Sequence, residues 1–288
     1  AIRRNRNPER RRIAAAMTEV PADAPTQALI LVADDGAVRT LTLNRPAALN
    51  AFDAPLHAAL RDALDAAAAE RSVRALVLTG AGRGFCSGQD LADPTLGDPA
   101  GDAFDLQRVV AERYAPLVER LRTLPLPVVA AVNGVAAGAG ASIALACDVV
   151  VAARSASFVQ AFSRIGLVPD AGASWLLPRL VGRARALGMA LFGDKLPADE
   201  AERIGLVWRC VDDAELIATA HALATRLAQM PTRALVATRQ AFDHAQQLDL
   251  TAALAEEARL QGDFGRSADF REGVGAFAEK RPPRFGER

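Results

Sequence analysis

Short apolar segments alternate with amphipathic ones along most of the chain. Residues 38–43 (VRTLTL) alternate between apolar and polar positions and end at the turn sequence Asn-Arg-Pro, a pattern typical of a strand. Continuous apolar runs at 75–79, 128–132 and 148–152 are typical of buried strands. The pattern therefore predicts several strands, most of them without a polar face.

Helical patterns separate these predicted strands. Leu56, Leu60 and Leu64 recur at intervals of four and share one helical face, and Asp53 is a favoured cap for a helix that runs to about Glu70. Two further helices are predicted at 105–124 and 140–146. Because strands and helices alternate, we predict an α/β fold.

From Leu196 onward the pattern is almost wholly helical. Helices are predicted at 198–204, 213–229, 232–246, 251–262 and 267–279. We therefore divide the folded chain into an α/β core at 26–195 and a helical region at 196–288.

The first 25 residues differ from the rest. Six arginines lie within the first twelve positions and prolines follow, with no apolar segment of the kind that a secretory signal carries. We predict that residues 1–25 form a disordered basic extension outside the fold. The arginines are Arg3, Arg4, Arg6, Arg10, Arg11 and Arg12.

Charge and composition narrow the class of partner. The 34 basic and 34 acidic residues balance, with an isoelectric point near 7.1, which argues against nucleic acid or a highly charged partner. No apolar run approaches the roughly 20 residues that span a bilayer, so we expect no membrane association. Cys86, Cys147 and Cys210 are an odd number without metal-like spacing. We expect free thiols in a reducing cytoplasm, and no metal site.

Two glycine-rich turns follow predicted buried strands. The first is GRGFCSGQDL at 82–91, and the second is NGVAAGAG at 133–140. Small residues let a ligand approach the backbone closely. Two such turns, each with a free N–H, are what an oxyanion hole needs.

These turns, with the segments LTLNRPAALNAF, LVPDAGASWLLPRLVGRARA and GRSADFREGVGAF, resemble the crotonase superfamily of enoyl-CoA hydratases and isomerases over residues 28–285. The resemblance implies a spiral of ββα turns with a C-terminal helical trimerisation region, and an acyl-CoA substrate. Within the superfamily the chain is most similar to the phenylacetate-degradation isomerases, which convert the ring-1,2-epoxide of phenylacetyl-CoA to oxepin-CoA. We expect no cofactor apart from the coenzyme A of the substrate.

The resemblance also assigns catalytic roles. The backbone N–H groups of Ser87 and Ala139 would stabilise the thioester enolate. The positions of the two glutamates that hydratases use to add water hold Ser142 and Phe162 here. One carboxylate remains, Asp170, which aligns with the acid/base of the isomerase branch, so we expect isomerisation rather than hydration.

Asp170 has a second interpretation, as the N-cap of a helix that begins near Ala171. An apolar environment would raise the pKa of the carboxyl, whereas a helix N-terminus would lower it. The two roles are compatible.

Contacts with coenzyme A are implied for the first glycine turn and for two distant segments. Arg45 would pair with a phosphate, with Ala47 beside it, and Phe277 and Lys280 would reach the nucleotide, often from a neighbouring subunit; the alternative for these residues is ordinary surface and packing. No P-loop and no dinucleotide fingerprint is present. In the first turn the implied contacts are Phe85, Ser87, Gly88, Gln89, Asp90 and Leu91.

Other polar and aromatic residues receive structural interpretations. We expect Asp90 to hold its turn through hydrogen bonds to the backbone and Cys86 to pack, and the loop at 93–102 to lie beside the site. Tyr114 and Phe104 are candidates for the wall of the acyl pocket. The three histidines, which lie in helical stretches without an oriented partner, are expected to pack or to face solvent; they are His57, His221 and His244.

Three alternatives to the epoxide isomerase remain open. The first is a Δ3,Δ2-enoyl-CoA isomerase of fatty-acid or dehydroadipyl-CoA type, and the second is a catalytically inert CoA-binding subunit of a larger assembly. The third is RNA binding through the basic N-terminus, although a charge run is more often a solvated tail. For either isomerase we expect a homotrimer or hexamer.

Overall fold

The computed structural model describes residues 28–97 and 105–288. The predicted basic extension at 1–25 lies outside the described residues. So do Phe104 and the second half of the loop predicted at 93–102.

A six-stranded sheet forms the centre of the molecule, and its first two strands are joined as an antiparallel hairpin. All other neighbours are parallel. Every residue of β3 and β5 is buried, as expected for strands covered on both faces. In spatial order the strands are β1 (Ile30–Asp35), β2 (Val38–Leu43), β3 (Ala75–Gly80), β5 (Val128–Val132), β7 (Val149–Ala153) and β10 (Arg209–Val211).

A second, four-stranded sheet lies beside the first. Its order is β4 (Gly84–Cys86), β6 (Val135–Ala137), β8 (Ser157–Val159) and β9 (Lys195–Pro197). The strands β3, β5 and β7 of the large sheet each lead through a short turn into a strand of the small sheet, and a helix follows. The chain thus repeats a ββα unit, which confirms the predicted α/β fold and its spiral of ββα turns.

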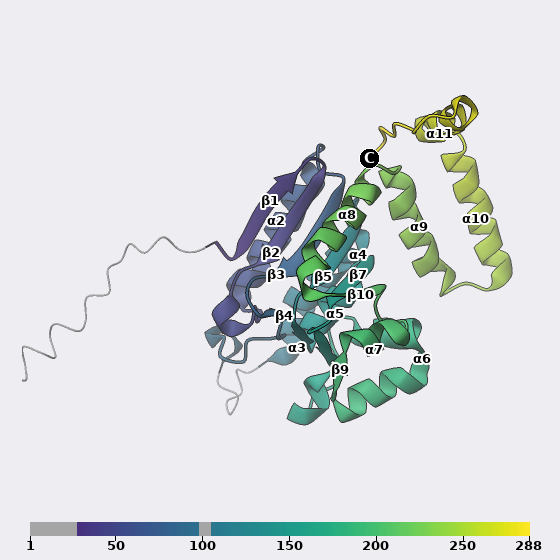
Figure 1. Cartoon of the computed structure of the whole chain (residues 1–288). Coiled ribbons are helices and arrows are strands. Elements are labelled where there is room, and N and C mark those ends of the chain that lie inside the picture. Colours follow the sequence, from purple (N-terminus) through teal and green to yellow (C-terminus); the bar gives the residue numbers. More distant parts are fainter. Residues whose placement is uncertain (1–27, 98–104) are drawn as a thin grey trace, which may run out of the picture.

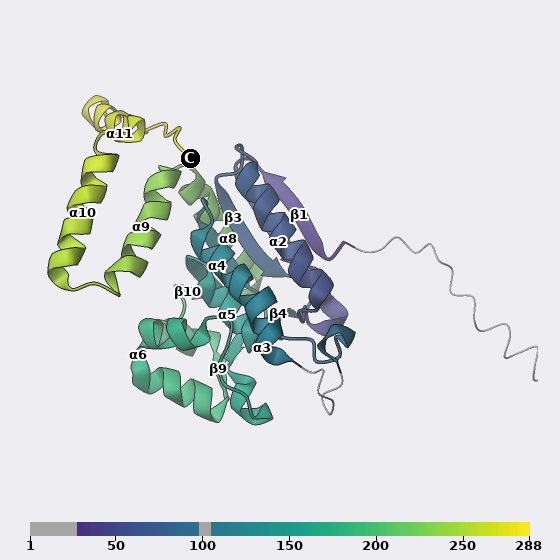
Figure 2. The same ribbon diagram turned by 180° about the vertical axis from the view of Figure 1, so that it is seen from behind.

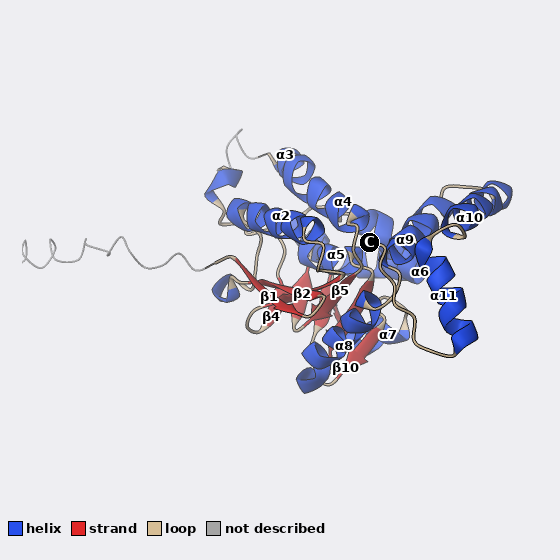
Figure 3. Cartoon of the chain, turned by 90° about the horizontal axis from the view of Figure 1, so that it is seen from above, coloured by secondary structure: helices blue, strands red, loops and turns tan. Residues whose placement is uncertain are grey.

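Helices cover both faces of the large sheet, with α2 packed on one face and α8 on the other (Figure 3). Asp53 caps α2 as predicted, since its carboxylate accepts the Leu56 N–H at 2.8 Å. A π-helical turn at Val110–Tyr114 joins α3 to α4. The helices of this part are α2 (Ala54–Ala69), α3 (Leu106–Val109), α4 (Ala115–Thr123), α5 (Ala139–Ala146), α6 (Ala173–Phe192), α7 (Ala198–Arg203) and α8 (Leu216–Ala228), with short 3-10 segments at Pro46–Ala48, Pro94–Leu96, Ala161–Ile165 and Asp213–Glu215.

The last three helices stand away from the two sheets (Figures 1 and 2). They are α9 (Thr232–Ala245), α10 (Leu250–Phe264) and α11 (Ala268–Glu279). Arg239 anchors α9 to the core, because its buried guanidinium pairs with Asp148 at 3.0 Å and donates to the carbonyls of Leu124 and Leu126.

The prediction of an almost wholly helical pattern from Leu196 onward is wrong in two places. Leu196 lies inside β9, which pairs with β8, and β10 completes the large sheet beside β7. Both strands have only three residues, too few for a periodic pattern to identify. Among the described residues no helix combines the length and the apolar character needed to cross a bilayer.

Candidate active site

A small cavity of about 150 Å³ lies where the two glycine turns meet. Ligand pockets usually enclose about 300–1,000 Å³, so this cavity suits an acyl group rather than a whole coenzyme A ester. Ser87, Ala139 and Asp170 all line it, as the sequence predicts for one site. Much of the remaining wall is apolar and comprises Leu106, Val109, Val110, Phe162, Ile165 and Leu167.

The backbone N–H of Ser87 is not available to a ligand. It donates a hydrogen bond of 3.0 Å to the carbonyl oxygen of Leu49. The prediction that Ser87 supplies an oxyanion donor is therefore wrong. Gly88 explains the error: its φ of +94° interrupts the regular alternation of an extended strand, so N–H directions beyond Cys86 do not follow from sequence position.

Gln89, in the first turn, has a backbone N–H that is free to bind a ligand. The Phe52 N–H donates to the Gly88 carbonyl at 2.7 Å, and the Asp90 N–H donates to the Phe52 carbonyl at 2.9 Å. These two bonds form a parallel bridge between Phe52 and Gln89 and leave the Gln89 N–H on the opposite side. Among the described residues it has no acceptor, and Gln89 lines the cavity.

The second turn supplies a donor at a helix N-terminus. Gly138, with φ +51°, precedes Ala139, the first residue of α5. The N–H of Gly138 donates to the Val159 carbonyl at 2.8 Å, whereas that of Ala139 has no acceptor within the described part of the chain. The positive end of the helix dipole adds to its attraction for an anion.

Glycine at position 88 allows the two turns to touch. A Cβ atom placed on Gly88 would lie 2.9 Å from the Ala137 carbonyl oxygen and 3.4 Å from the Ala139 nitrogen. Any larger residue would push the turns apart and cover the Ala139 N–H. Gly140 packs as closely, since a Cβ there would lie 2.4 Å from the Cys86 carbonyl oxygen.

Asp170 presents its carboxylate in a largely apolar part of this cavity. Burial raises the pKa of Asp170 from 3.8 to about 6, against a smaller opposing effect of its own backbone N–H. One carboxylate oxygen is buried and has no hydrogen-bond partner among the described residues. The alternative N-cap role is wrong, because α6 begins at Ala173 with Gly172 as a cap that has no side chain. Ala171 (φ +48°) and Gly172 (φ +84°) both adopt left-handed conformations, which turn the chain sharply after Asp170.

Neither residue at the hydratase glutamate positions is ionisable. The hydroxyl of Ser142 lies 3.2 Å from the Gly138 carbonyl oxygen and 3.1 Å from that of Asp170. Phe162 lines the cavity and lies against Gly138. Among the residues that line the described cavity, Asp170 is the one carboxylate.

Tyr114 forms part of the wall, as predicted, and contacts the donor residue. Its buried hydroxyl donates to the side-chain oxygen of Gln89 at 3.0 Å. The ring of His57 packs edge-on against Tyr114, with 4.4 Å between ring centroids. Burial lowers the pKa of His57 to about 3, so this histidine is a neutral packing residue, as expected. The π-helical turn places Val110 and Tyr114 together in the cavity wall.

Two further residues of the first turn have the structural roles expected of them. The Asp90 carboxylate accepts the N–H of Ala92 at 3.0 Å. Cys86 is fully buried, and burial raises the pKa of its thiol to about 12, so it packs rather than reacts. No group of three potential metal ligands is present in residues 28–97 or 105–288.

The segment Asn44–Phe52 supports the first turn in a way that sequence reasoning missed. The buried side chain of Asn50 donates to the carbonyls of Gly84 and Phe85 at 2.9 and 3.1 Å. Its own oxygen accepts the N–H of Arg45 at 2.9 Å. An asparagine beside a proline turn signals a loop, but not which distant strand it will hold.

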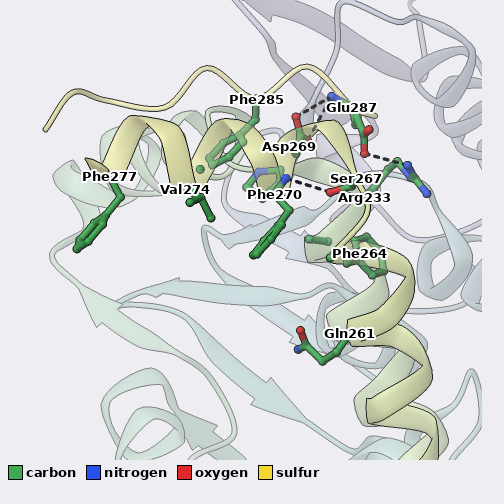
Figure 4. Close-up of a pocket in the computed structure, with 14 residues that line it drawn as sticks. Arg233, Gln261, Phe264, Ser267, Asp269, Phe270, Val274, Phe277, Phe285 and Glu287 are labelled. Carbon is green, nitrogen blue, oxygen red and sulfur yellow. Dashed lines mark hydrogen bonds and ion pairs between the residues drawn. The ribbon is translucent and has the colours of Figure 1, made fainter. Parts of the chain in front are cut away.

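The predicted nucleotide contacts are not brought together within one chain. Arg45 and Ala47 lie at the first turn, whereas Phe277 and Lys280 lie on or just after α11, far from β4 (Figures 1 and 2). Phe277 is 87% exposed and borders a separate hollow of about 410 Å³ between α9, α10 and α11 (Figure 4). The roles of these residues toward coenzyme A stay predictions.

Comparison with known proteins agrees with this geometry. The sequence profile described as enoyl-CoA hydratase/isomerase matches residues 34–288. The chain belongs to the enoyl-CoA hydratase/isomerase family. As a member of the crotonase family, it is an enzyme that acts on CoA thioesters.

Within the enoyl-CoA hydratase/isomerase family, two relatives at nearly equal identity carry different names. The chain is 53% identical to the 1,2-epoxyphenylacetyl-CoA isomerase of Escherichia coli (strain K12), over 86% of this chain and 94% of that protein. It is 54% identical to a protein of Rhodobacter capsulatus named "Probable enoyl-CoA hydratase", over 85% of this chain and 93% of that protein. A crystal structure of enoyl-CoA hydratase from Bacillus anthracis superposes with a TM-score of 0.82 at 31% identity, covering 90% of this chain and all of that one.

Proposed function

We propose that this protein is an acyl-CoA isomerase and that its preferred reaction converts the ring-1,2-epoxide of phenylacetyl-CoA to oxepin-CoA. One observation carries the proposal. A single carboxylate with a raised pKa lines a mostly apolar cavity together with Gln89 and Ala139, whose backbone N–H groups have no acceptor among the described residues. Addition of water calls for a carboxylate pair that positions and activates it, and this cavity offers one carboxylate.

The chemistry follows from these groups. The thioester carbonyl oxygen accepts hydrogen bonds from the N–H groups of Gln89 and Ala139. The Asp170 carboxylate removes a proton from the carbon beside the carbonyl, and the two donors stabilise the enolate oxygen. Each such donor typically contributes about 2.7–4 kcal/mol to the transition state. The Asp170 carboxyl then returns the proton to a more distant carbon, so the product is an isomer of the substrate.

Ring expansion of the epoxide makes the same demands. Substrate and product are isomers, so the reaction needs neither water nor a redox partner. The cavity wall of aliphatic and aromatic side chains suits a ring, and Phe162 occupies space near Gly138 where a water-activating glutamate would otherwise be expected. The E. coli relative supports this substrate. The Rhodobacter relative keeps hydration as the competing activity.

A Δ3,Δ2-enoyl-CoA isomerase is the second candidate. A single base between two carbons is sufficient for a double-bond shift, and the raised pKa of Asp170 suits both halves of the proton transfer.

We also propose that copies of the chain assemble as trimers through α9, α10 and α11. These helices present large apolar side chains to solvent, among them Phe242 (69% exposed), Leu250 (75%) and Phe277 (87%). Exposed apolar surface of this kind marks an interface in a stable protein. Light scattering of the purified chain measures the assembly directly, and a monomer would contradict it.

A panel of three thioesters tests the proposed reaction. The purified full chain is incubated in ¹⁸O-labelled water with a 2-enoyl-CoA, the matching 3-enoyl-CoA and the phenylacetyl-CoA epoxide. The products are separated by liquid chromatography, and their masses are measured by mass spectrometry. We expect isomers of the epoxide, of the 3-enoyl-CoA, or of both, without ¹⁸O. A labelled 3-hydroxyacyl-CoA formed at a comparable rate would make the protein a hydratase.

A further inference from the structure

Arg45 lies at the centre of a cluster of ionised groups behind the first glycine turn. Its Nη2 atom lies 3.0 Å from the Asp53 carboxylate and 3.0 Å from that of Asp90, while Nη1 donates to the Ala51 carbonyl at 2.5 Å. About a fifth of each of these three side chains is exposed. Partly buried pairs of this kind are screened less by salt than surface ion pairs.

This cluster carries a net charge of −1, since one guanidinium faces two carboxylates. A phosphate brought to Arg45 would meet both carboxylates and would compete with them for the same nitrogen. The local charge therefore opposes the phosphate contact that the family resemblance implies.

The carboxylates link Arg45 to two different parts of the site. Asp53 caps α2 through the Leu56 N–H, which fixes it to a rigid helix. Asp90 immediately follows Gln89, and its own N–H donates to the Phe52 carbonyl at 2.9 Å. Arg45 thus connects Asp90, the residue that follows Gln89, to Asp53 at the start of α2.

We propose that Arg45 is a positioning residue of the oxyanion hole, which fixes the Gln89 backbone through Asp90. The inference rests on the proposed function, because it takes the Gln89 N–H as the donor to the thioester oxygen. Without the guanidinium, Asp53 and Asp90 repel each other, and Asp90 moves with the Gln89 peptide that precedes it. A displacement of about 1 Å in such a group can cost about 100-fold in rate.

The test compares Arg45→Met with wild type on two substrates that have the same acyl group. One is the CoA thioester, and the other is the N-acetylcysteamine thioester, which carries no phosphate. We expect kcat to fall by about 10- to 100-fold on both, with little change in KM. A rise in KM confined to the CoA thioester, with kcat retained, would overturn the inference in favour of a phosphate contact, and unchanged kinetics on both would also overturn it.

Companion variants separate positioning from a general loss of structure. Arg154→Met removes an arginine from an exposed ion pair with Asp212 and should leave both substrates unaffected. Asp90→Asn breaks the pair with Arg45 yet keeps an oxygen for the Ala92 N–H. Because it also removes the repulsion from Asp53, the double variant Arg45→Met/Asp90→Asn should recover activity to the level of Asp90→Asn alone. Additive losses would contradict the inference.

Failure of the proposed isomerase function can be distinguished from failure of the positioning role of Arg45. If wild type converts neither thioester, the isomerase proposal fails, and amide hydrogen exchange still reports on Arg45. We expect the Asp90 N–H to exchange faster in Arg45→Met than in wild type or Arg154→Met, whereas equal rates would refute the positioning role.

Discussion

The hydroxyl of Ser142 lies 3.1 Å from the main-chain carbonyl oxygen of Asp170. The family resemblance assigns Ser142 to a position where hydratases carry a glutamate, and in this structure it links the first turn of α5 to the loop that holds the candidate base. Serine in place of glutamate at position 142 means one carboxylate fewer in the site, and its hydroxyl supports the loop that carries the remaining carboxylate, Asp170.

Replacement of Ser142 by alanine tests this support. The variant removes one of two donors to the Asp170 carbonyl, which keeps the Ala173 N–H, so we expect the free energy of unfolding to fall by about 0.5–1.5 kcal/mol. Denaturant titration measures the change. Thr232→Val is the matched control, because the buried Thr232 hydroxyl has no partner among the described residues and its loss should cost little. Equal effects of the two substitutions would show that the Ser142 hydroxyl does not support the loop.

The pH dependence of the rate reports on Asp170. The carboxyl has a pKa of about 6 in the folded protein, and a base must be deprotonated to act. We therefore expect kcat/KM to rise with pH up to about 6 and then to level off. A profile that is flat between pH 5 and 8 would contradict the assignment of Asp170 as the base.

The same carboxyl should weaken the fold at neutral pH. Its pKa is raised from 3.8 to about 6 on folding, so the folded chain binds the proton more tightly than the unfolded chain. Stability contributed by this group is complete below pH 4 and is lost as the pH rises through 6. Asp170→Asn should accordingly stabilise the protein by about 1–2 kcal/mol at pH 7.5, allowing for partial solvent exposure, and by almost nothing at pH 3.5. Urea titrations at the two pH values measure the difference, and a gain that is the same at both would contradict it.

Gly88→Ala should abolish most of the activity. The new methyl group would crowd the Ala137 carbonyl oxygen and cover the Ala139 N–H, so we expect kcat to fall by about 100- to 1,000-fold. Gly36→Ala is the control, since Gly36 also has a positive φ but has open space around it. That variant should lose about 1–2 kcal/mol of stability and keep its rate. Steady-state kinetics on folded protein distinguish the two, and similar rates for both variants would show that the turn contact is not needed.

The larger elements could be predicted from sequence because long periodic segments determine them. The α2 helix and the strands β2 and β5 have the predicted bounds within one residue. The three-residue strands β4, β6, β8, β9 and β10 could not be recognised, because a pattern of period two needs more positions than they offer. They form through pairing with distant strands rather than through local preference.

The candidate site was predictable in its parts but not in its atomic detail. The two glycine turns and Asp170 meet in one cavity, as the sequence indicates. The assignment of Ser87 as a donor failed because backbone direction in the first turn depends on the left-handed Gly88 and on acceptors from Leu49 and Phe52. Sequence position alone contains neither piece of information.

The central claim is that one carboxylate moves the proton. The most direct test is kcat of Asp170→Asn on whichever thioester the wild type isomerises, beside Asp212→Asn, which neutralises a carboxylate in an exposed ion pair. The account predicts that Asp170→Asn loses about 100- to 10,000-fold in kcat while Asp212→Asn matches wild type. Undiminished turnover by Asp170→Asn would place the proton transfer on another group and contradict the account.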